Sequence, residues 1–384
     1  MSAIGIHDLA IATASNVLTL DALAEYQGVD PAKYHIGLGQ DEMSVPGPDE
    51  DIVTMAAAAA LPIIERHGTD GIRTLFLATE SGIDQSKSAG VFVHRLLGLP
   101  ATCRVVELKQ ACYSATAGLQ AALGIVARHP GERVLVIAAD VAKYDLDSAA
   151  EATQGAGAVA MLVSADPALV EIEPATGVFT ADVDDFWRPN DRSTAVVDGK
   201  LSIVAYLDAL VGAFDDYRAH GGVEVTEFAR FAHHQPFTKM AAKAHKRLAE
   251  HTGVDLGDEL FADSTRYNRV IGNGYTASLY LGLAALLDAE TDLTGGRIGL
   301  FSYGSGSVSE FFAGVVVPGY REHLRREETA AALAARVPVS IERYRELHGT
   351  GGVVLSDDLV VEPASAGPFH FTGVTGHARG YARR

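Results

Sequence analysis

Apolar strand-like runs alternate with Ala- and Leu-rich helical runs along most of the chain, and this alternation is the feature that most restricts its fold. Residues 73–79 and 133–139 are expected to be buried strands, because each is a nearly continuous apolar run, and residues 104–108 are expected to be a third strand. Residues 89–97 and 113–128 are expected to be helices, because Ala and Leu recur there at helical spacing. Strands that alternate with helices are typical of an α/β fold in which helices cover sheets.

The second part of the chain repeats this rhythm. Its expected elements are strands over 228–233 and 297–303, helices over 239–251 and 275–287, and a strand over 313–317 that closes the sheet. The repetition on either side of about residue 170 predicts two related halves, residues 1–170 and 171–384, although no residue-level repeat is visible. A chain of 384 residues is long enough for one large α/β unit or for two fused ones.

The net charge limits the partners of the protein. With 31 basic and 49 acidic residues the formal charge is −18, which excludes nonspecific binding to nucleic acid or to anionic lipid. The charge does not exclude a small anionic ligand that a local cluster of lysines binds. The longest apolar runs, 55–64 and 155–164, are shorter than the roughly 20 residues that a membrane span needs. We therefore expect a soluble, cytoplasmic protein without a membrane segment.

Cys112 follows a predicted strand across a short turn and directly precedes the helix expected from Tyr113. Unpaired N–H groups and the positive end of the dipole at a helix N-terminus favour thiolate over thiol, and they can also bind an oxyanion. The position therefore predicts a nucleophile with a lowered pKa, although an inert core cysteine is the alternative. Cys103, the second cysteine, has no helix after it and is expected to be structural. No metal-binding motif occurs, so no metal site is expected.

Three further positions carry side chains with possible chemistry. Glu80 closes the strand 73–79, where desolvation raises the pKa of a carboxylate toward that of a general base, although Glu80 could equally cap the next helix. His234 lies at the end of the strand 228–233, where an imidazole can face a pocket, although most such histidines are not catalytic. Lys239 and Lys243 are four residues apart and therefore lie on one helix face. This spacing suits a phosphate-binding site, and a solvated surface pair is the alternative.

Nine short sequence motifs lie between about residues 30 and 310, and several of them contain the positions named above. They are 33–40 (KYHIGLGQ), 78–81 (ATES), 109–113 (KQACY), 153–160 (TQGAGAVA), 185–189 (DFWRP), 197–202 (VDGKLS), 234–240 (HQPFTKM), 272–276 (GNGYT) and 301–306 (FSYGSG). Through these motifs the chain resembles the 3-hydroxy-3-methylglutaryl-CoA synthases, a family of the thiolase superfamily, and it is most similar to their shorter bacterial form.

The resemblance implies a thiolase-like fold, layered α-β-α-β-α, and a homodimer. It also implies a condensation of the mevalonate route in which Cys112 takes the acetyl group of acetyl-CoA, Glu80 removes a proton from the acetyl methyl, and His234 orients the ketone of acetoacetyl-CoA. The CoA thioesters are substrates, so no cofactor is implied. The family positions that contact CoA correspond to Pro31, Ala32, Lys33, Lys239 and Lys243, and those that line the acyl pocket correspond to Asp30, Thr153, Ser202, Asn273 and Ser305.

Three features depart from the family pattern. Ala152 stands where many members have proline, so the pocket loop is expected to be more mobile or differently placed. His233 directly precedes His234, and alternation along a strand is expected to point it to the opposite face. The region beyond about residue 320 matches loosely and receives no predicted role.

Other functions remain compatible with the sequence. The nearest alternative is a homologous synthase of polyketide β-branching, whose acceptor is bound to a carrier protein and which would need a basic patch. A β-ketoacyl synthase fits less well, because those enzymes lack the glutamate motif. A noncatalytic acyl-CoA-binding relative is the alternative from another class, and the joint presence of Cys112, Glu80 and His234 disfavours it.

Overall fold

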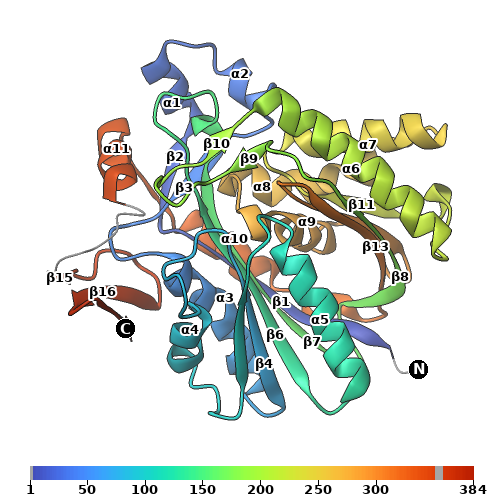
Figure 1. Cartoon of the computed structure of the whole chain (residues 1–384), viewed down its shortest axis with the longest axis horizontal. Coiled ribbons are helices and arrows are strands. Elements are labelled where there is room, and N and C mark those ends of the chain that lie inside the picture. The colour runs from blue at the N-terminus through green and yellow to red at the C-terminus, as the bar shows by residue number, and fades with distance from the viewer. Residues whose placement is uncertain (1–2, 351–357) are drawn as a thin grey trace.

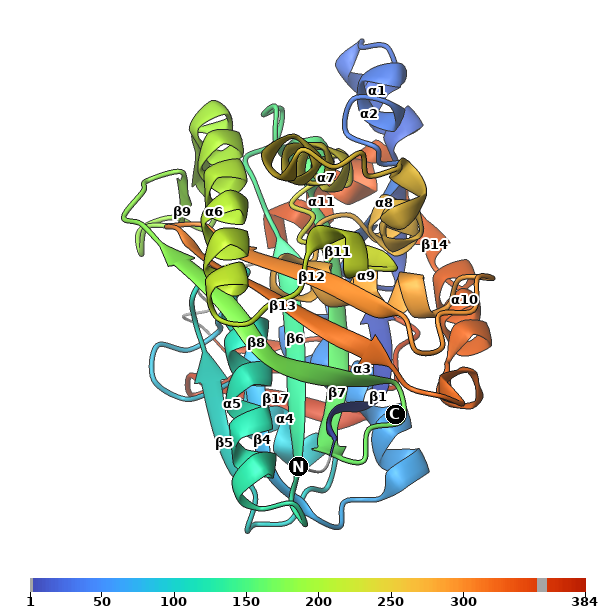
Figure 2. The same ribbon diagram turned by 90° about the vertical axis from the view of Figure 1, so that its right-hand side faces the viewer.

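The computed structural model describes residues 3–350 and 358–384, and its centre is a nine-stranded mixed sheet (Figures 1 and 2). The strands, in their order across the sheet, are β11 (Arg230–His233), β12 (Arg297–Gly304), β13 (Val308–Val316), β8 (Val170–Thr180), β1 (Ile4–Thr13), β7 (Gly155–Ala165), β6 (Arg133–Ala142), β4 (Ile72–Ala78) and β5 (Arg104–Leu108). β1 and β8 pair through Gly5 with Glu171 and Ile6 with Val170, so a short contact joins two larger parts.

The two parts of the sheet have the same pattern of strand directions. In the N-terminal part β4 is parallel to β6, and β6–β7 and β7–β1 are antiparallel. In the C-terminal part β11 is parallel to β12, and β12–β13 and β13–β8 are antiparallel. This correspondence confirms the expected pair of related halves. The boundary near residue 170, in the connection between β7 and β8, stays a prediction.

The main helices of the described residues cover the sheet in three layers. They are α3 (Ile52–His67), α4 (Gly90–Leu96), α5 (Ser114–Arg128), α6 (Gly199–Ala219), α7 (Lys239–Thr252) and α9 (Ser278–Leu287). α3 and α4 pack on the outer face of the N-terminal part, α6 and α7 pack on the outer face of the C-terminal part, and α5 and α9 lie between the two parts. The expected α-β-α-β-α layering is therefore present.

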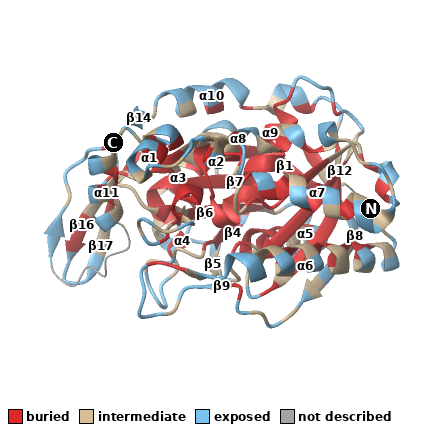
Figure 3. Cartoon of the chain, turned by 90° about the horizontal axis from the view of Figure 1, so that it is seen from above, coloured by how far each residue is buried: buried red, intermediate tan, exposed pale blue. Residues whose placement is uncertain are grey.

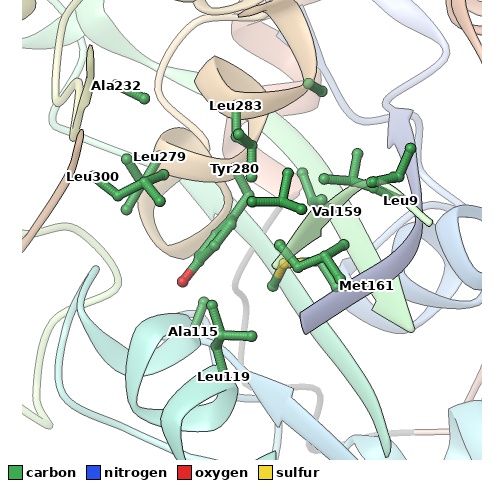
Figure 4. Close-up of a cluster of buried hydrophobic side chains, with 14 of the residues drawn as sticks. Leu9, Ala115, Leu119, Val159, Met161, Ala232, Leu279, Tyr280, Leu283 and Leu300 are labelled. Atoms are coloured by element: carbon green, nitrogen blue, oxygen red, sulfur yellow. The ribbon is translucent and has the colours of Figure 1, made fainter. Parts of the chain in front are cut away.

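The central layer is held by apolar contacts between α5 and α9. Tyr280 of α9 points toward Ala115 and Leu119 of α5, whereas Leu279 lies beside Leu300 of β12, and residues of both parts of the sheet surround them (Figure 4). Figure 3 shows the buried residues concentrated in the strands and in the inner faces of these helices. Burial of this apolar area is the main favourable contribution to folding.

Burial on both faces explains why the strands are so apolar. Along β6, Val134 and Val136 face α5, whereas Leu135 and Ile137 face α3, so consecutive residues are all buried. The same property explains why one prediction is wrong, namely that residues 313–317 close the sheet. Residues 313–316 belong to β13, which lies between β12 and β8 in the interior of the sheet. A strand covered on both faces has the same apolar pattern wherever it lies in the sheet, so the pattern does not indicate its position.

The region beyond residue 320 packs on the rest of the chain. Its elements are α10 (Arg326–Ala334), β14 (Val337–Pro338), α11 (Ile341–Thr350), β15 (Leu359–Val360), β16 (Phe369–Thr375) and β17 (Ala378–Arg383). Arg325, which directly precedes α10, donates to both carboxylate oxygens of buried Asp8 at 3.1 and 2.6 Å. Within the part of the chain that the structure describes, no helix is long and apolar enough to cross a membrane.

Gly177 of β8 allows α6 to approach the sheet closely. A Cβ atom at this position would lie 2.0 Å from the Tyr217 nitrogen and 2.2 Å from the Ala213 oxygen, both of them backbone atoms of α6. Backbone cannot move aside as a flexible side chain can, so a larger residue would push α6 away from the sheet.

Gly177→Ala is expected to lower the free energy of unfolding by about 1–3 kcal/mol, because the added methyl group overpacks this contact. Urea denaturation measures the change. The matched control is Gly124→Ala in the middle of α5, where a Cβ would meet no atom within 4 Å. That control is expected to stabilise the protein by up to about 1 kcal/mol, since alanine is the better helix former. Equal stabilities of Gly177→Ala and the unaltered protein would contradict the prediction.

Candidate active site

Cys112 lies in the tight turn that joins β5 to α5, two residues before the helix begins. Ala111 has a positive φ of 42°, a conformation that costs an alanine roughly 1–2 kcal/mol. The Ser114 hydroxyl holds the turn, because it accepts the N–H of Gln110 and donates to the Ala111 carbonyl at 2.9 Å. The first residue of α5 thus fixes the direction of the cysteine side chain.

The Cys112 thiol donates to Glu80, with 2.9 Å between Sγ and Oε1. The structure therefore brings together two predicted catalytic residues that are far apart in sequence. Glu80 lies two residues after the end of β4, close to the expected strand end, and its main-chain carbonyl accepts a hydrogen bond from Arg188. Its carboxyl group thus points to the thiol and does not cap the next helix.

A buried carboxylate that sequence analysis missed, Asp140 of β6, holds the backbone around Glu80. Its Oδ1 accepts from the Thr79 hydroxyl at 2.8 Å and from the N–H groups of Glu80 and Ser81 at 2.9 Å each. Its Oδ2 accepts from the N–H of Thr276 at 3.1 Å and from the hydroxyl of the same residue at 2.5 Å. Asp140 thus connects β4, β6 and the segment before α9. A carboxylate within an otherwise apolar strand is the sequence signal that could have identified it.

Burial and the nearby charge of Asp140 raise the pKa of the Glu80 carboxyl group to about 8. This confirms the expectation of a desolvated carboxylate at the end of a strand. A carboxyl group with this pKa exchanges its proton near neutral pH, which is what general acid and base catalysis requires.

The expectation that Cys112 has a lowered pKa is wrong. Burial raises the pKa of the thiol well above its ordinary value, and the charge of Glu80 raises it further. The helix N-terminus does not compensate, because the N–H groups of Tyr113 and Ser114 already donate within the turn, to the carbonyls of Gln110 and Ala111. The helix dipole contributes about 2 kcal/mol at most, which is less than the cost of burying a thiolate beside a carboxylate.

Three aromatic side chains form an apolar cluster with Cys112. Tyr144, Phe186 and Tyr275 pack edge to face, with ring centroids between 5.7 and 6.5 Å apart. They come from the loop after β6, from the short strand β9 (Phe186–Trp187) and from the segment before α9. Sequence reasoning identified none of these side chains as part of the site. Their rings exclude water from one side of the thiol.

His234 follows β11 directly, beside the neighbouring parallel strand β12. Its N–H donates to the Phe301 carbonyl at 2.8 Å, and its own carbonyl accepts from the Tyr206 hydroxyl at 2.7 Å. Burial lowers the pKa of the imidazole to about 3, so the ring is neutral at neutral pH. His233 stacks on Phe231 with ring centroids 5.9 Å apart and also lies beside His245 of α7. The expectation that His233 and His234 point to opposite faces stays a prediction.

The loop after β12 packs directly on the turn that carries Cys112. A Cβ atom on Gly304 would lie 2.5 Å from the Gln110 oxygen and 2.7 Å from the Tyr113 nitrogen, so only glycine fits there. The Ser305 carbonyl accepts from the Gln110 side chain at 3.4 Å. Asp185 holds the loop from the other side, because it accepts the N–H of Gly306 at 2.8 Å.

Of the five residues expected to line the acyl pocket, the structure places Ser305, Thr153 and Asn273 close to the cysteine or its aromatic neighbours. Asn273 accepts the N–H of Tyr275 at 2.8 Å and donates its own N–H to the Thr153 carbonyl at 3.4 Å.

The other two residues expected in the pocket have no described contact with Cys112 or its aromatic neighbours. Asp30 is exposed and accepts the N–H of Ala32 at 2.9 Å, at the start of α2 (Ala32–His35). Ser202 lies in the first turn of α6, where its N–H donates to the Asp198 carbonyl at 2.8 Å. Within residues 3–350 and 358–384, no hydrogen bond of either residue reaches Cys112. Their roles stay predictions.

The residues expected to contact CoA meet where α2 approaches the start of α7. The Lys239 N–H donates to the Leu38 carbonyl at 2.7 Å, which attaches the segment after α2 to α7. Lys33, Lys239 and Lys243 are all exposed, as is Pro31, and Ala32 is partly buried. A cationic surface formed by two elements is therefore present. The described residues contain no group of three or more His, Cys, Asp or Glu side chains that could bind a metal ion.

Comparison with known proteins connects this geometry to a family. A family model for the N-terminal part of hydroxymethylglutaryl-coenzyme A synthase matches residues 1–168, and the model for the C-terminal part matches 170–254 and 250–348. Hydroxymethylglutaryl-CoA synthase of Enterococcus faecalis is 44% identical over 348 residues, which cover 90% of this chain and 91% of the relative. The chain belongs to the hydroxymethylglutaryl-CoA synthase family.

Further relatives and solved structures extend this result. The polyketide biosynthesis 3-hydroxy-3-methylglutaryl-ACP synthase PksG of Bacillus subtilis is 35% identical, covering 92% of this chain and 90% of PksG. A crystal structure of HMG-CoA synthase complexed with CoA superposes with a TM-score of 0.92 at 37% identity and full coverage of both chains. The HMG synthase of curacin biosynthesis in complex with holo donor-ACP gives a TM-score of 0.93 at 33% identity, also with full coverage. These matches confirm the thiolase-like fold of this synthase.

The electrostatic coupling of Cys112 and Glu80 is testable by titration. Glu80→Gln removes the negative charge beside the thiol, so the pKa of Cys112 is expected to fall by about one unit or more. Iodoacetamide alkylation of Cys112, followed by mass spectrometry from about pH 6 to pH 10, measures this shift, because only the thiolate reacts. The alkylation of Cys103 is expected to keep its pH dependence and serves as the internal control. Cys103 precedes β5 at the end where Arg104 pairs with Thr74, whereas Glu80 follows the other end of β4. An unchanged profile for Cys112 would contradict the coupling.

Proposed function

We propose that this protein condenses acetyl-CoA with acetoacetyl-CoA and water to give 3-hydroxy-3-methylglutaryl-CoA and CoA, through an acetyl group on Cys112. The contact of 2.9 Å between the Cys112 Sγ and the Glu80 Oε1 carries this proposal, because it places a nucleophile and a base of suitable pKa side by side. The reaction uses CoA thioesters as substrates and requires no cofactor. Membership of the synthase family supports it, as do relatives named for the same reaction.

The first step transfers the acetyl group to the enzyme. The buried thiol is protonated at neutral pH, and Glu80, which is in hydrogen-bond contact with it, can accept its proton when the carboxyl group is in its ionised form. The Sγ atom attacks the thioester carbonyl of acetyl-CoA, the bond between carbonyl carbon and CoA sulfur breaks, and the proton held by Glu80 passes to the departing CoA thiolate. Glu80 is then a carboxylate again.

The second step forms the carbon–carbon bond. The Glu80 carboxylate removes a proton from the methyl of the acetyl group on Cys112, and the resulting carbanion attacks the ketone carbon of acetoacetyl-CoA. Glu80 returns the proton to the new alkoxide. The neutral imidazole of His234 can donate one hydrogen bond to the ketone oxygen, and its low pKa keeps it uncharged in this role. Water then cleaves the thioester to Cys112 and releases the product.

The lysines at α2 and α7 would bind the phosphates of CoA. A chain with a net charge of −18 repels an anionic substrate at long range, so binding depends on local cations. Lys33, Lys239 and Lys243 supply three such charges on the exposed surface of two adjacent elements. This placement supports a CoA site at the outer end of the acyl pocket.

A carrier-protein-bound acceptor, as in polyketide β-branching, is the second candidate. The observation that favours it is a row of exposed lysines on α7, in which Lys246 continues the series Lys239 and Lys243 by one more turn. Such a row would suit an acidic protein surface. Lys246 lies 3.8 Å from Glu250, however, which reduces its availability to a partner and makes the free CoA thioester the preferred acceptor.

We also propose a cytoplasmic homodimer that acts in the mevalonate pathway. β5 is at one edge of the large sheet, and a strand edge has N–H and C=O groups that can pair with a second copy across a two-fold axis. Both cysteines are free, as is usual in a reducing compartment. The substrates of the proposed reaction are soluble anions of such a compartment.

Incubation with acetyl-CoA labelled in its acetyl group, followed by peptide mapping, tests the covalent step. The label is expected on the peptide that contains Cys112, and Cys103→Ser serves as the control that keeps the label. Glu80→Ala is expected still to acetylate, because the thiol pKa falls when the charge is removed. Its condensation rate is expected to fall by a factor of about 100 or more, the contribution of a positioned base. Label elsewhere, or full condensation by Glu80→Ala, would refute the mechanism.

Substitution of single lysines distinguishes the two acceptors. Lys239→Ala is expected to raise the KM for acetyl-CoA about fivefold at low salt, with a smaller difference at high salt, because phosphate contacts at the surface are screened. Lys246→Ala is the matched control on the same helix and is expected to leave this KM unchanged. If Lys246→Ala impaired turnover of a carrier-protein-bound acceptor while acetoacetyl-CoA was a poor substrate, the β-branching function would be favoured instead.

A further inference from the structure

The loop between β6 and β7 is held by a buried polar network that the mechanism above does not use. At its centre is Glu151, fully buried in the short helix η1 (Glu151–Thr153). One carboxylate oxygen accepts from the Gln27 side chain at 2.9 Å and from the N–H of Asp147 at 2.7 Å. The other accepts from the Tyr344 hydroxyl at 2.9 Å. The carboxylate thus has three donors, which its burial requires.

Tyr344 and His348 of α11 attach this loop to the C-terminal region. The buried Tyr344 hydroxyl, which donates to Glu151, also accepts from the Gln154 side-chain amide at 2.7 Å. His348 lies one turn later, with its Nε2 at 2.8 Å from the Tyr144 carbonyl. Burial lowers the pKa of His348 to about 4, so the ring is neutral and its Nε2–H donates to that carbonyl. α11 lies in the region for which no role was predicted, and it contacts the loop at both of its ends.

The contacts converge on the residues beside the proposed acyl pocket. The Gln154 side-chain oxygen accepts the N–H of Tyr144 at 2.7 Å, so Tyr344 holds Gln154 and Gln154 holds Tyr144. The Tyr144 ring packs in the apolar cluster that includes Cys112. Thr153 lies between Glu151 and Gln154 and therefore has both of its neighbours fixed. The hydroxyl of Tyr344 is thus two hydrogen bonds away from the aromatic wall of the thiol.

The same network extends to the proposed CoA site. The Gln27 side chain that donates to Glu151 accepts from the Tyr34 hydroxyl at 2.5 Å. Tyr34 belongs to α2, next to Lys33, and α11 packs against α1 (Leu20–Gln27) (Figure 1). One buried network therefore fixes α2 and the wall beside Cys112 relative to each other.

We propose that Tyr344 is a positioning residue, whose hydroxyl orders the loop 144–154 so that the Tyr144 ring closes the acyl pocket of Cys112 against water. The inference rests on the proposed function, because it concerns the fate of the acetyl group on Cys112. The acetyl group has two fates. The methyl carbon attacks acetoacetyl-CoA, or water attacks the carbonyl carbon, the bond between that carbon and Sγ breaks, acetate leaves and one proton returns to the sulfur. A looser wall admits water and favours the second fate.

Tyr344→Phe tests this role, because it removes the hydroxyl and keeps the ring. The measured quantity is the ratio of acetate released from labelled acetyl-CoA to condensation with acetoacetyl-CoA. This ratio is independent of the fraction of folded enzyme, so a purely structural role would leave it unchanged. The ratio is expected to rise about fivefold, as loss of one buried hydrogen bond would give.

Two further variants keep the test decisive. Tyr320→Phe is the matched control, since Tyr320 is equally buried and its hydroxyl accepts the N–H of Leu293 at 3.2 Å, away from the loop. It is expected to lower stability without changing the ratio. His348→Ala, which removes the contact to the Tyr144 carbonyl, is expected to raise the ratio also and replaces Tyr344→Phe if that variant does not fold.

The outcomes separate the two proposals. If Tyr344→Phe and His348→Ala both keep the ratio of the unaltered protein while that protein condenses the two thioesters, the inference about Tyr344 is wrong and the proposed function stands. If the unaltered protein does not acquire label on Cys112 at all, the proposed function itself fails.

Discussion

The hydrogen bonds to the Asp140 carboxylate are the interaction on which the site depends. Asp140 accepts from residues that follow β4 and from Thr276 before α9, so one buried charge joins the N-terminal part of the sheet to the central helix layer. A buried carboxylate is tolerated only when its oxygens are fully partnered, and these bonds also fix the backbone of Glu80. The same charge raises the pKa of Glu80, so Asp140 determines both the position and the proton affinity of the proposed base.

The contact with Glu80 changes how the thiol of Cys112 can be activated. A thiol at a helix N-terminus is usually activated by the electrostatics of the helix, but here burial and a neighbouring carboxylate oppose ionisation. The thiol must therefore lose its proton before it reacts, and a base within contact distance favours this step. Glu80 meets this condition, and the aromatic side chains around Cys112 exclude water, which would compete for the acetyl group.

Much of the fold follows from local sequence patterns. Apolar runs located β4, β5 and β6 to within a few residues, and helical spacing located α4, α5 and α7, because these patterns reflect burial of a face or of both faces. The interior position of β13 could not be predicted, since the order of strands depends on long-range pairing. The C-terminal helix α11 received no role for a similar reason. Its Tyr344 is polar and isolated in the sequence, and its partner Glu151 is 193 residues away.

The sequence by itself determined which residues we propose to supply the chemistry. The motifs around Glu80, Cys112 and His234 are short and local, and a nucleophile before a helix, a carboxylate after a strand and an imidazole at a strand end can each be recognised there. Only the tertiary structure decided how these groups ionise. The thiol of Cys112 has a raised pKa because a carboxylate from 32 residues earlier contacts it and apolar rings from three further segments bury it. Proton affinity depends on the whole surrounding of a group, and that surrounding forms only when distant segments pack together.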